Sequence, residues 1–134
     1  MNRFWYFVYT FWPRVLRTYE VFFHHHRQKF LIGHLIPQKT ANDLKKHLTK
    51  HGFEHAIISL KDPGEVLAMR KREGKEFQYH IRLFNDNEIR AHYEYAPEAH
   101  PITHSFNVRQ ERKEEYFKEL LNGYLKPLLN APQD

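Results

Sequence analysis

The feature that most constrains the fold is an alternation of apolar and polar residues over residues 66–95, interrupted by two turn sequences. Because successive side chains of a strand point to opposite faces, this alternation predicts two adjoining β-hairpins whose faces follow from parity. The apolar face collects Leu67, Met69, Phe77, Tyr79, Ile81, Leu83, Ile89, Ala91, Tyr93 and Tyr95. The other face, called the polar face below, collects Arg70, Arg72, Gln78, His80, Arg82, Arg90, His92 and Glu94. We expect the apolar face to be buried. The leading hypothesis below takes the polar face as exposed, and the sequence leaves open whether His80 and His92 on it are exposed or covered.

The turn sequences set the expected register of the two hairpins. A three-residue loop over residues 73–75 pairs Phe77 with Lys71, Tyr79 with Met69 and Ile81 with Leu67. A loop over residues 85–87 with Asn87 in the left-handed region is a type I turn plus a bulge. This loop pairs His80 with His92, Arg82 with Arg90, and Leu83 with Ile89. A two-residue loop there would place apolar residues opposite polar ones, which burial disfavours.

Two further strands and two helices are expected around the hairpins. Residues 29–36 and 55–61 have the content of strands, and residues 62–64 have that of a turn. Between these strands, Thr40 is the expected N-cap of a helix that ends before Gly52. A loop is expected over residues 96–108, and an apolar stripe predicts the last helix over residues 109–125.

The first 26 residues hold ten of the 21 aromatic side chains, and the pattern there supports two interpretations. A spacing of three to four residues favours a helix face, whereas the Trp, Tyr, Phe, Val and Thr content of residues 4–12 favours a strand. Pro13 starts a helix or kinks one. We expect a helix over residues 13–26 and leave residues 3–12 open.

These elements predict a single α+β domain. The order is β-α-β-β-β-β-α behind an aromatic N-terminal segment, with helices packed on one face of a four- to five-stranded, mainly antiparallel sheet. We divide the chain into a basic N-terminal segment, residues 1–28, and one α+β domain, residues 29–134. Strand order does not follow from the sequence.

Composition narrows the classes of function. The chain has no cysteine, which excludes disulfides and thiolate metal sites. No run reaches the ~18 apolar residues of a membrane span. Residues 1–36 carry five basic and one acidic group, whereas residues 37–134 carry sixteen and fifteen. The net charge of +5 therefore lies mostly in the N-terminal segment. We expect a cytoplasmic protein, with peripheral membrane contact as the alternative.

The polar face is the first candidate site. Arg82 and Arg90 on neighbouring strands repel each other unless an anion lies between them, and arginine forks bind phosphate well. The expected ligand-binding residues are Arg70, Arg72, Arg82, Arg90, Gln78 and Glu94. His80 and His92 beside them are candidates for a catalytic acid and base. The alternative is that the face is only the solvated side of a sheet.

A divalent-metal site is the second candidate. His92, Glu94, His100 and His104 have the spacing H-x-E-x5-H-x3-H. Nitrogen and oxygen ligands of this kind, with one position left open, are typical of catalytic zinc. The signal is weak, because the chain has eleven histidines and Pro101 disfavours a helix that would align His100 with His104.

Three hypotheses of function follow. The first is a binding module that holds nucleic acid or another phosphate-bearing ligand on the polar face. The second is a hydrolase of phosphodiester-type bonds that uses His80 and His92 with or without a metal. The third is an interaction or membrane-peripheral protein that uses residues 1–28 for self-association or for contact with a membrane surface.

Overall fold

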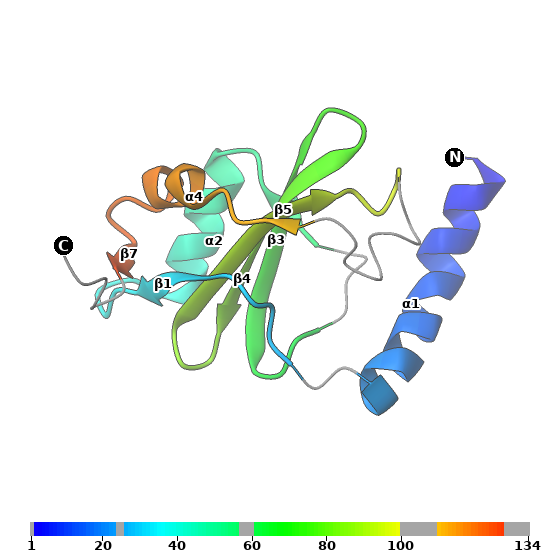
Figure 1. Cartoon of the computed structure of the whole chain (residues 1–134), viewed down its shortest axis with the longest axis horizontal. Helices are drawn as coiled ribbons and strands as arrows, with labels where there is room; N and C mark the ends of the chain where they lie inside the picture. The colour runs from blue at the N-terminus through cyan, green and yellow to red at the C-terminus, as the bar shows by residue number, and fades with distance from the viewer. Residues whose placement is uncertain (1, 24–25, 57–60, 100–109, 128–134) are drawn as a thin grey trace.

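A computed structural model of the chain describes residues 2–23, 26–56, 61–99 and 110–127, and these form an α+β fold around one antiparallel sheet (Figure 1). Its strands are β1 (Leu31–Leu35), β2 (Glu54–His55), β3 (Glu65–Glu73), β4 (Phe77–Phe84), β5 (Glu88–Tyr95), β6 (Gln110–Glu111) and β7 (Leu125–Pro127). The strand order is β2-β3-β4-β5-β1-β7, and β6 also pairs with β5. The predicted fold class is confirmed. The two strands beyond the expected five, β6 and β7, span only two and three residues.

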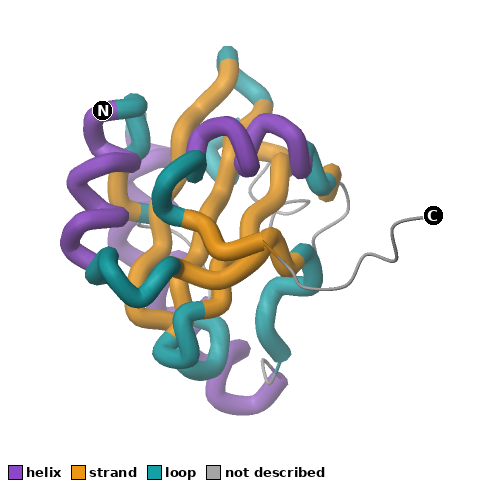
Figure 2. Tube along the Cα trace, turned by 90° about the vertical axis from the view of Figure 1, so that its left-hand side faces the viewer, coloured by secondary structure: helices purple, strands orange, loops and turns teal. Residues whose placement is uncertain are grey.

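The helices lie on both sides of this sheet. They are α1 (Arg3–Phe23), α2 (Ala41–Lys50) and α4 (Glu114–Leu120). Helices α2 and α4 cover one face, as expected, whereas α1 lies beyond the opposite face (Figures 1 and 2). None of the described helices is long and apolar enough to cross a membrane.

Helix α2 begins and ends where the sequence predicts. The Thr40 hydroxyl accepts a hydrogen bond from Asp43 N at 3.1 Å, and Thr40 N donates to the Asp43 carboxylate at 2.8 Å. Gly52 follows the helix at φ 87°, a conformation that favours glycine. Leu44 and Leu48 point from α2 into the core and are fully buried.

The hydrophobic core lies between α2, α4 and the apolar face of the sheet. Its buried members are Ile32, Leu35, Leu44, Leu48, Phe53, Leu67, Met69, Ile81, Leu83, Ile89, Ala91, Phe117 and Leu121. The alternation of the hairpins therefore predicts correctly which face packs on the hydrophobic core.

The register of the second hairpin is confirmed, but that of the first is wrong by two residues. His80 pairs with His92 and Arg82 with Arg90, and Asn87 has φ 67°. In the first hairpin, Tyr79 pairs with Lys71 rather than Met69. A shift of two residues keeps every side chain on its own face, so the apolar pattern does not distinguish the two registers.

The C-terminal helix is shorter than predicted. It covers Glu114–Leu120, and residues 125–127 form β7 beside β1 instead of a last helical turn. Gly123 has φ 86° and ends the helical path. The close approach of β7 requires Gly33, because a Cβ there would lie 2.6 Å from the backbone oxygen of Lys126. Gly33 also adjoins a register shift in the β1–β5 pairing, a position where glycine inside a strand is common.

Residues 3–12, which the sequence left open, are helical, and Pro13 lies inside α1. Asn2 Oδ1 accepts a hydrogen bond from Phe4 N at 3.1 Å at the start of this helix. Helical spacing thus prevails over strand propensity here, because it places Val8 on a buried side of the helix. The helix is described as far as Phe23, residues 24 and 25 lie outside the described residues, and His26, the predicted last residue, is not helical.

Candidate functional site

The polar face, which we expected to be exposed, is largely buried. Six of its residues are at most 7% exposed, namely Arg70, Gln78, His80, Arg82, His92 and Glu94. Arg72 is exposed and Arg90 is half-buried. Segments 26–30, 61–65 and 96–99 supply polar groups that contact this face, and their acidic side chains neutralise its arginines. Burial of charge is tolerated only when it is paired in this way.

The two buried arginines of the polar face each contact two carboxylates. Arg82 Nη1 lies 3.0 Å from Asp62 Oδ1 and 2.5 Å from Glu65 Oε1. Arg70 contacts Glu98, and its Nη2 lies 3.1 Å from Glu54 Oε1. These ion pairs supply the negative charge that we expected from a bound phosphate.

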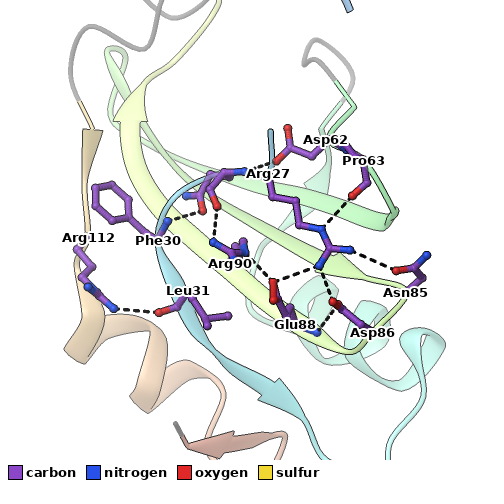
Figure 3. A network of polar contacts seen from close by, with 11 residues as sticks. Arg27, Phe30, Leu31, Asp62, Pro63, Asn85, Asp86, Glu88, Arg90 and Arg112 are labelled. Atoms are coloured by element: carbon purple, nitrogen blue, oxygen red, sulfur yellow. Dashed lines mark hydrogen bonds and ion pairs between the residues drawn. The ribbon is translucent and has the colours of Figure 1, made fainter. Parts of the chain in front are cut away.

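Arg27 fixes the segment that follows α1 (Figure 3). Its guanidinium donates to Pro63 O at 3.1 Å, Asp86 Oδ2 at 2.6 Å and Glu88 Oε2 at 3.2 Å. It also lies 4.5 Å over the ring of Phe84. One side chain thus joins three parts of the chain: the segment after α1, the turn before β3 and the β4–β5 turn.

Arg90 and Gln28 connect this network to His92. Arg90 Nη1 donates to Gln28 O at 2.9 Å, and Gln28 N donates to Asp62 Oδ2 at 2.6 Å. The side-chain oxygen of Gln28 accepts from Phe30 N at 3.0 Å, and its amide nitrogen contacts His92 Nδ1. Gln28 therefore positions the ring of His92.

A histidine, histidine and glutamate cluster lies at the centre of the polar face. His80 on β4 is paired directly with His92 on β5, and Glu94 follows on the same face of β5. His80 Nδ1 lies 3.1 Å from Glu94 Oε1, and His92 Nε2 lies 2.7 Å from Glu94 Oε2. Gln78 Nε2 also donates to Glu94 Oε1 at 2.9 Å. All four side chains are at most 3% exposed.

His80 is neutral in this environment. Burial, followed by the positive charge of Arg82, lowers the pKa of His80 to about 3. A neutral imidazole carries one ring proton, and because the Glu94 carboxylate can only accept, this proton lies on His80 Nδ1, which donates a hydrogen bond to Glu94 Oε1. His80 Nε2 then carries a lone pair, and this atom is buried without a hydrogen-bond partner. His92 Nε2 also lacks an aligned hydrogen bond, despite its short distance from Glu94.

The structure places two of the four predicted metal ligands, His92 and Glu94, next to each other and adds His80 to them. His92 and Glu94 lie side by side, whereas His100 and His104 lie outside the described residues. His80 takes the third place, and one possible ligand atom from each of His80, His92 and Glu94 lies within 4.8 Å of the others. The strand register already indicated this neighbour, because it paired His80 with His92.

The low pKa of His80 predicts that the metal-free protein loses stability in acid. Below pH ~6.5 the unfolded chain binds a proton at His80 that the folded protein does not bind until pH about 3. Stability then falls by about 1.4 kcal/mol per pH unit from this group, or about 2 kcal/mol between pH 6.5 and pH 5. Urea unfolding with a chelator at several pH values measures this slope.

A glutamine variant isolates the contribution of His80 to this pH dependence. His80→Gln should lose most of the slope that His80 supplies, whereas His51→Gln, at an exposed position on the C-cap of α2, should leave it unchanged. An equal slope in the wild type and in His80→Gln would contradict the assignment.

Comparisons with protein-family models, with curated proteins and with solved structures find no match to this chain.

Proposed function

We propose that this protein binds a divalent transition-metal ion, with zinc preferred, through His80, His92 and Glu94. The observation that carries the proposal is that one possible ligand atom from each of the buried residues His80, His92 and Glu94 lies within 4.8 Å of the others, while the Nε2 atoms of both imidazoles have no hydrogen-bond partner. A buried polar atom without a partner costs about 1–3 kcal/mol, so such atoms in a folded protein call for an explanation. A cation shared by the three side chains would provide one.

The chemistry of the three ligands supports zinc. Two imidazoles and one carboxylate match the donor types of zinc sites, and neutral histidine is the form that binds metal. Burial keeps His80 in that form at neutral pH. The Gln28 amide nitrogen contacts His92 Nδ1, and its oxygen accepts from Phe30 N. Ligation through His92 Nε2 would move the ring proton to Nδ1, so the Gln28 amide would have to turn its oxygen toward that atom.

Metal-assisted hydrolysis is the activity that this ligand set supports best. Three protein ligands leave a fourth position for water, and zinc lowers the pKa of bound water enough to make it a nucleophile. Binding of nucleic acid or another phosphate stays a prediction. It has less support, because Arg70, Arg82 and Arg90 already contact carboxylates.

The test is zinc stoichiometry and affinity in the full chain with His24, His25 and His26 replaced by alanine. This background removes a run of histidines that can bind metal adventitiously. We expect about one zinc per chain and a loss of affinity of about a hundredfold in His80→Ala and in His92→Gln. His51→Ala, an exposed histidine, is the matched control.

Circular dichroism establishes that each variant is folded. Hydrolysis of a phosphodiester and of an ester is then compared in zinc-loaded and chelated protein. No zinc bound by the folded background protein would contradict the proposed site. Zinc binding without any hydrolysis would retain the site and reject the activity.

A further inference from the structure

Helix α1 carries two adjacent apolar strips that differ in burial. Val8 is 4% exposed, and Trp5 and Trp12 on the same side are half-buried. A second strip, called the outer strip below, follows at helical spacing and is 40–51% exposed: Phe4, Phe7, Phe11 and Val15. An exposed apolar strip of this kind marks an interaction surface, because water solvates it poorly.

The outer strip is accompanied by positive charge. Arg3 and Arg14 are exposed and lie within about 80° of the midline of the strip, at 100° per residue around the helix. The sequence has no acidic residue before Glu20. The arginine stems can lie along an apolar surface while their guanidinium groups reach polar headgroups.

We propose that the outer strip of α1 docks on an anionic membrane surface. Aromatic side chains on one helix face, with arginine beside them, are the requirements of a helix that lies in the plane of the membrane interface. Each basic side chain near an anionic surface adds about 1 kcal/mol of attraction. None of the described helices can span a membrane, so α1 lies along the surface over a length of about 18 Å for residues 3–15.

Charge favours a lipid surface over a second copy of this helix. Pairing two outer strips would bring Arg3 and Arg14 of both copies to one interface without any carboxylate from residues 1–19. Like charges so placed oppose association, whereas anionic headgroups neutralise them. The docking surface is independent of the zinc site, so either proposal can fail while the other holds.

The test is binding of the full chain to vesicles of phosphatidylcholine alone and with phosphatidylserine. Co-sedimentation measures the bound fraction. Binding is expected on the phosphatidylserine vesicles and should be at least about tenfold weaker on phosphatidylcholine alone. The double variant Phe7→Ser with Phe11→Ser should weaken vesicle binding by at least about tenfold, because it removes two rings that are exposed in the free protein and would be buried in the membrane interface.

Tyr6→Ser is the matched control, because Tyr6 is 62% exposed on the same helix but lies about 140° from the outer strip. It should bind vesicles as the wild type does. No binding to the phosphatidylserine vesicles, or an equal loss in Tyr6→Ser, would overturn the proposal. A third outcome is that the wild type does not bind vesicles but forms dimers in light scattering, and that the double Phe variant is monomeric. This outcome would overturn the proposal and identify the outer strip as a contact between copies.

Discussion

Replacing Arg82 with alanine is expected to lower the free energy of unfolding by about 3–5 kcal/mol. Arg82 is 7% exposed, and its guanidinium contacts Asp62 and Glu65, whose side chains are at most 9% exposed. The variant removes this positive charge and leaves both carboxylates in a site that water scarcely reaches. Burial already raises the pKa of Glu65, and Arg82 acts against that shift. Chemical denaturation at neutral pH measures the loss.

Arg72→Ala is the matched control for this variant. Arg72 lies on the same face of the sheet, on the neighbouring strand β3, but its side chain is 39% exposed and its Nε lies 3.7 Å from Glu98 Oε2. We expect it to cost under about 1 kcal/mol. The penalty of Arg82→Ala should also shrink in mild acid, where Glu65 takes up a proton and needs no counter-charge. A similar cost for both arginine variants would show that burial of the Arg82 pair has little energetic effect.

Phe117→Ala is expected to destabilise the protein by about 3–5 kcal/mol. Phe117 is fully buried on α4, at the centre of the core between that helix and the sheet, and its ring meets that of Tyr79 edge-on at 6.0 Å. Truncation removes apolar area from the core and leaves a cavity that the sheet and α2 hold open. Thermal and urea unfolding both report the loss.

Two further substitutions on α4 delimit that effect. Phe117→Leu keeps most of the apolar volume and should cost clearly less than the alanine variant. Lys118→Ala changes an exposed side chain that pairs with Glu114 at 2.9 Å, and it should cost under about 1 kcal/mol. If Phe117→Ala were no worse than Lys118→Ala, α4 would not be part of the cooperative core.

Local patterns predicted most of the fold. The alternation over residues 66–95 identified the face that packs on the hydrophobic core, and the turn sequence with Asn87 in the left-handed region predicted the β4–β5 register. Thr40 and Asp43 located the start of α2 through a capping pattern of four residues. Each of these features depends on neighbours in the sequence, so reasoning from the sequence reaches them.

The covered polar face could not be predicted in the same way. A strand face of arginine, histidine and glutamine looks the same in sequence whether water or protein covers it. What covers this face are distant groups, such as Asp62 against Arg82, Glu98 against Arg70 and Gln28 against His92. The one available signal was the nearly equal number of acidic and basic residues after residue 36.

The histidine cluster combines both kinds of information. The turn over residues 85–87 placed His80 opposite His92, and parity placed Glu94 on the same face, so the sequence brought the three together. It did not indicate their burial, which makes His80 neutral and leaves its Nε2 without a hydrogen bond. The spacing-based metal set instead relied on His100 and His104, which lie outside the described residues.

The contrast between the two faces of the sheet has a consequence for the response of the protein to temperature. The face toward α2 and α4 is stabilised by apolar burial, which weakens on cooling. The other face is held by paired charges, and the cost of removing charges from water falls as the temperature rises. Heating therefore makes the paired charges of the polar face more stabilising at temperatures where the free energy gained from apolar burial no longer increases. Together, the two faces broaden the temperature range over which the sheet stays folded.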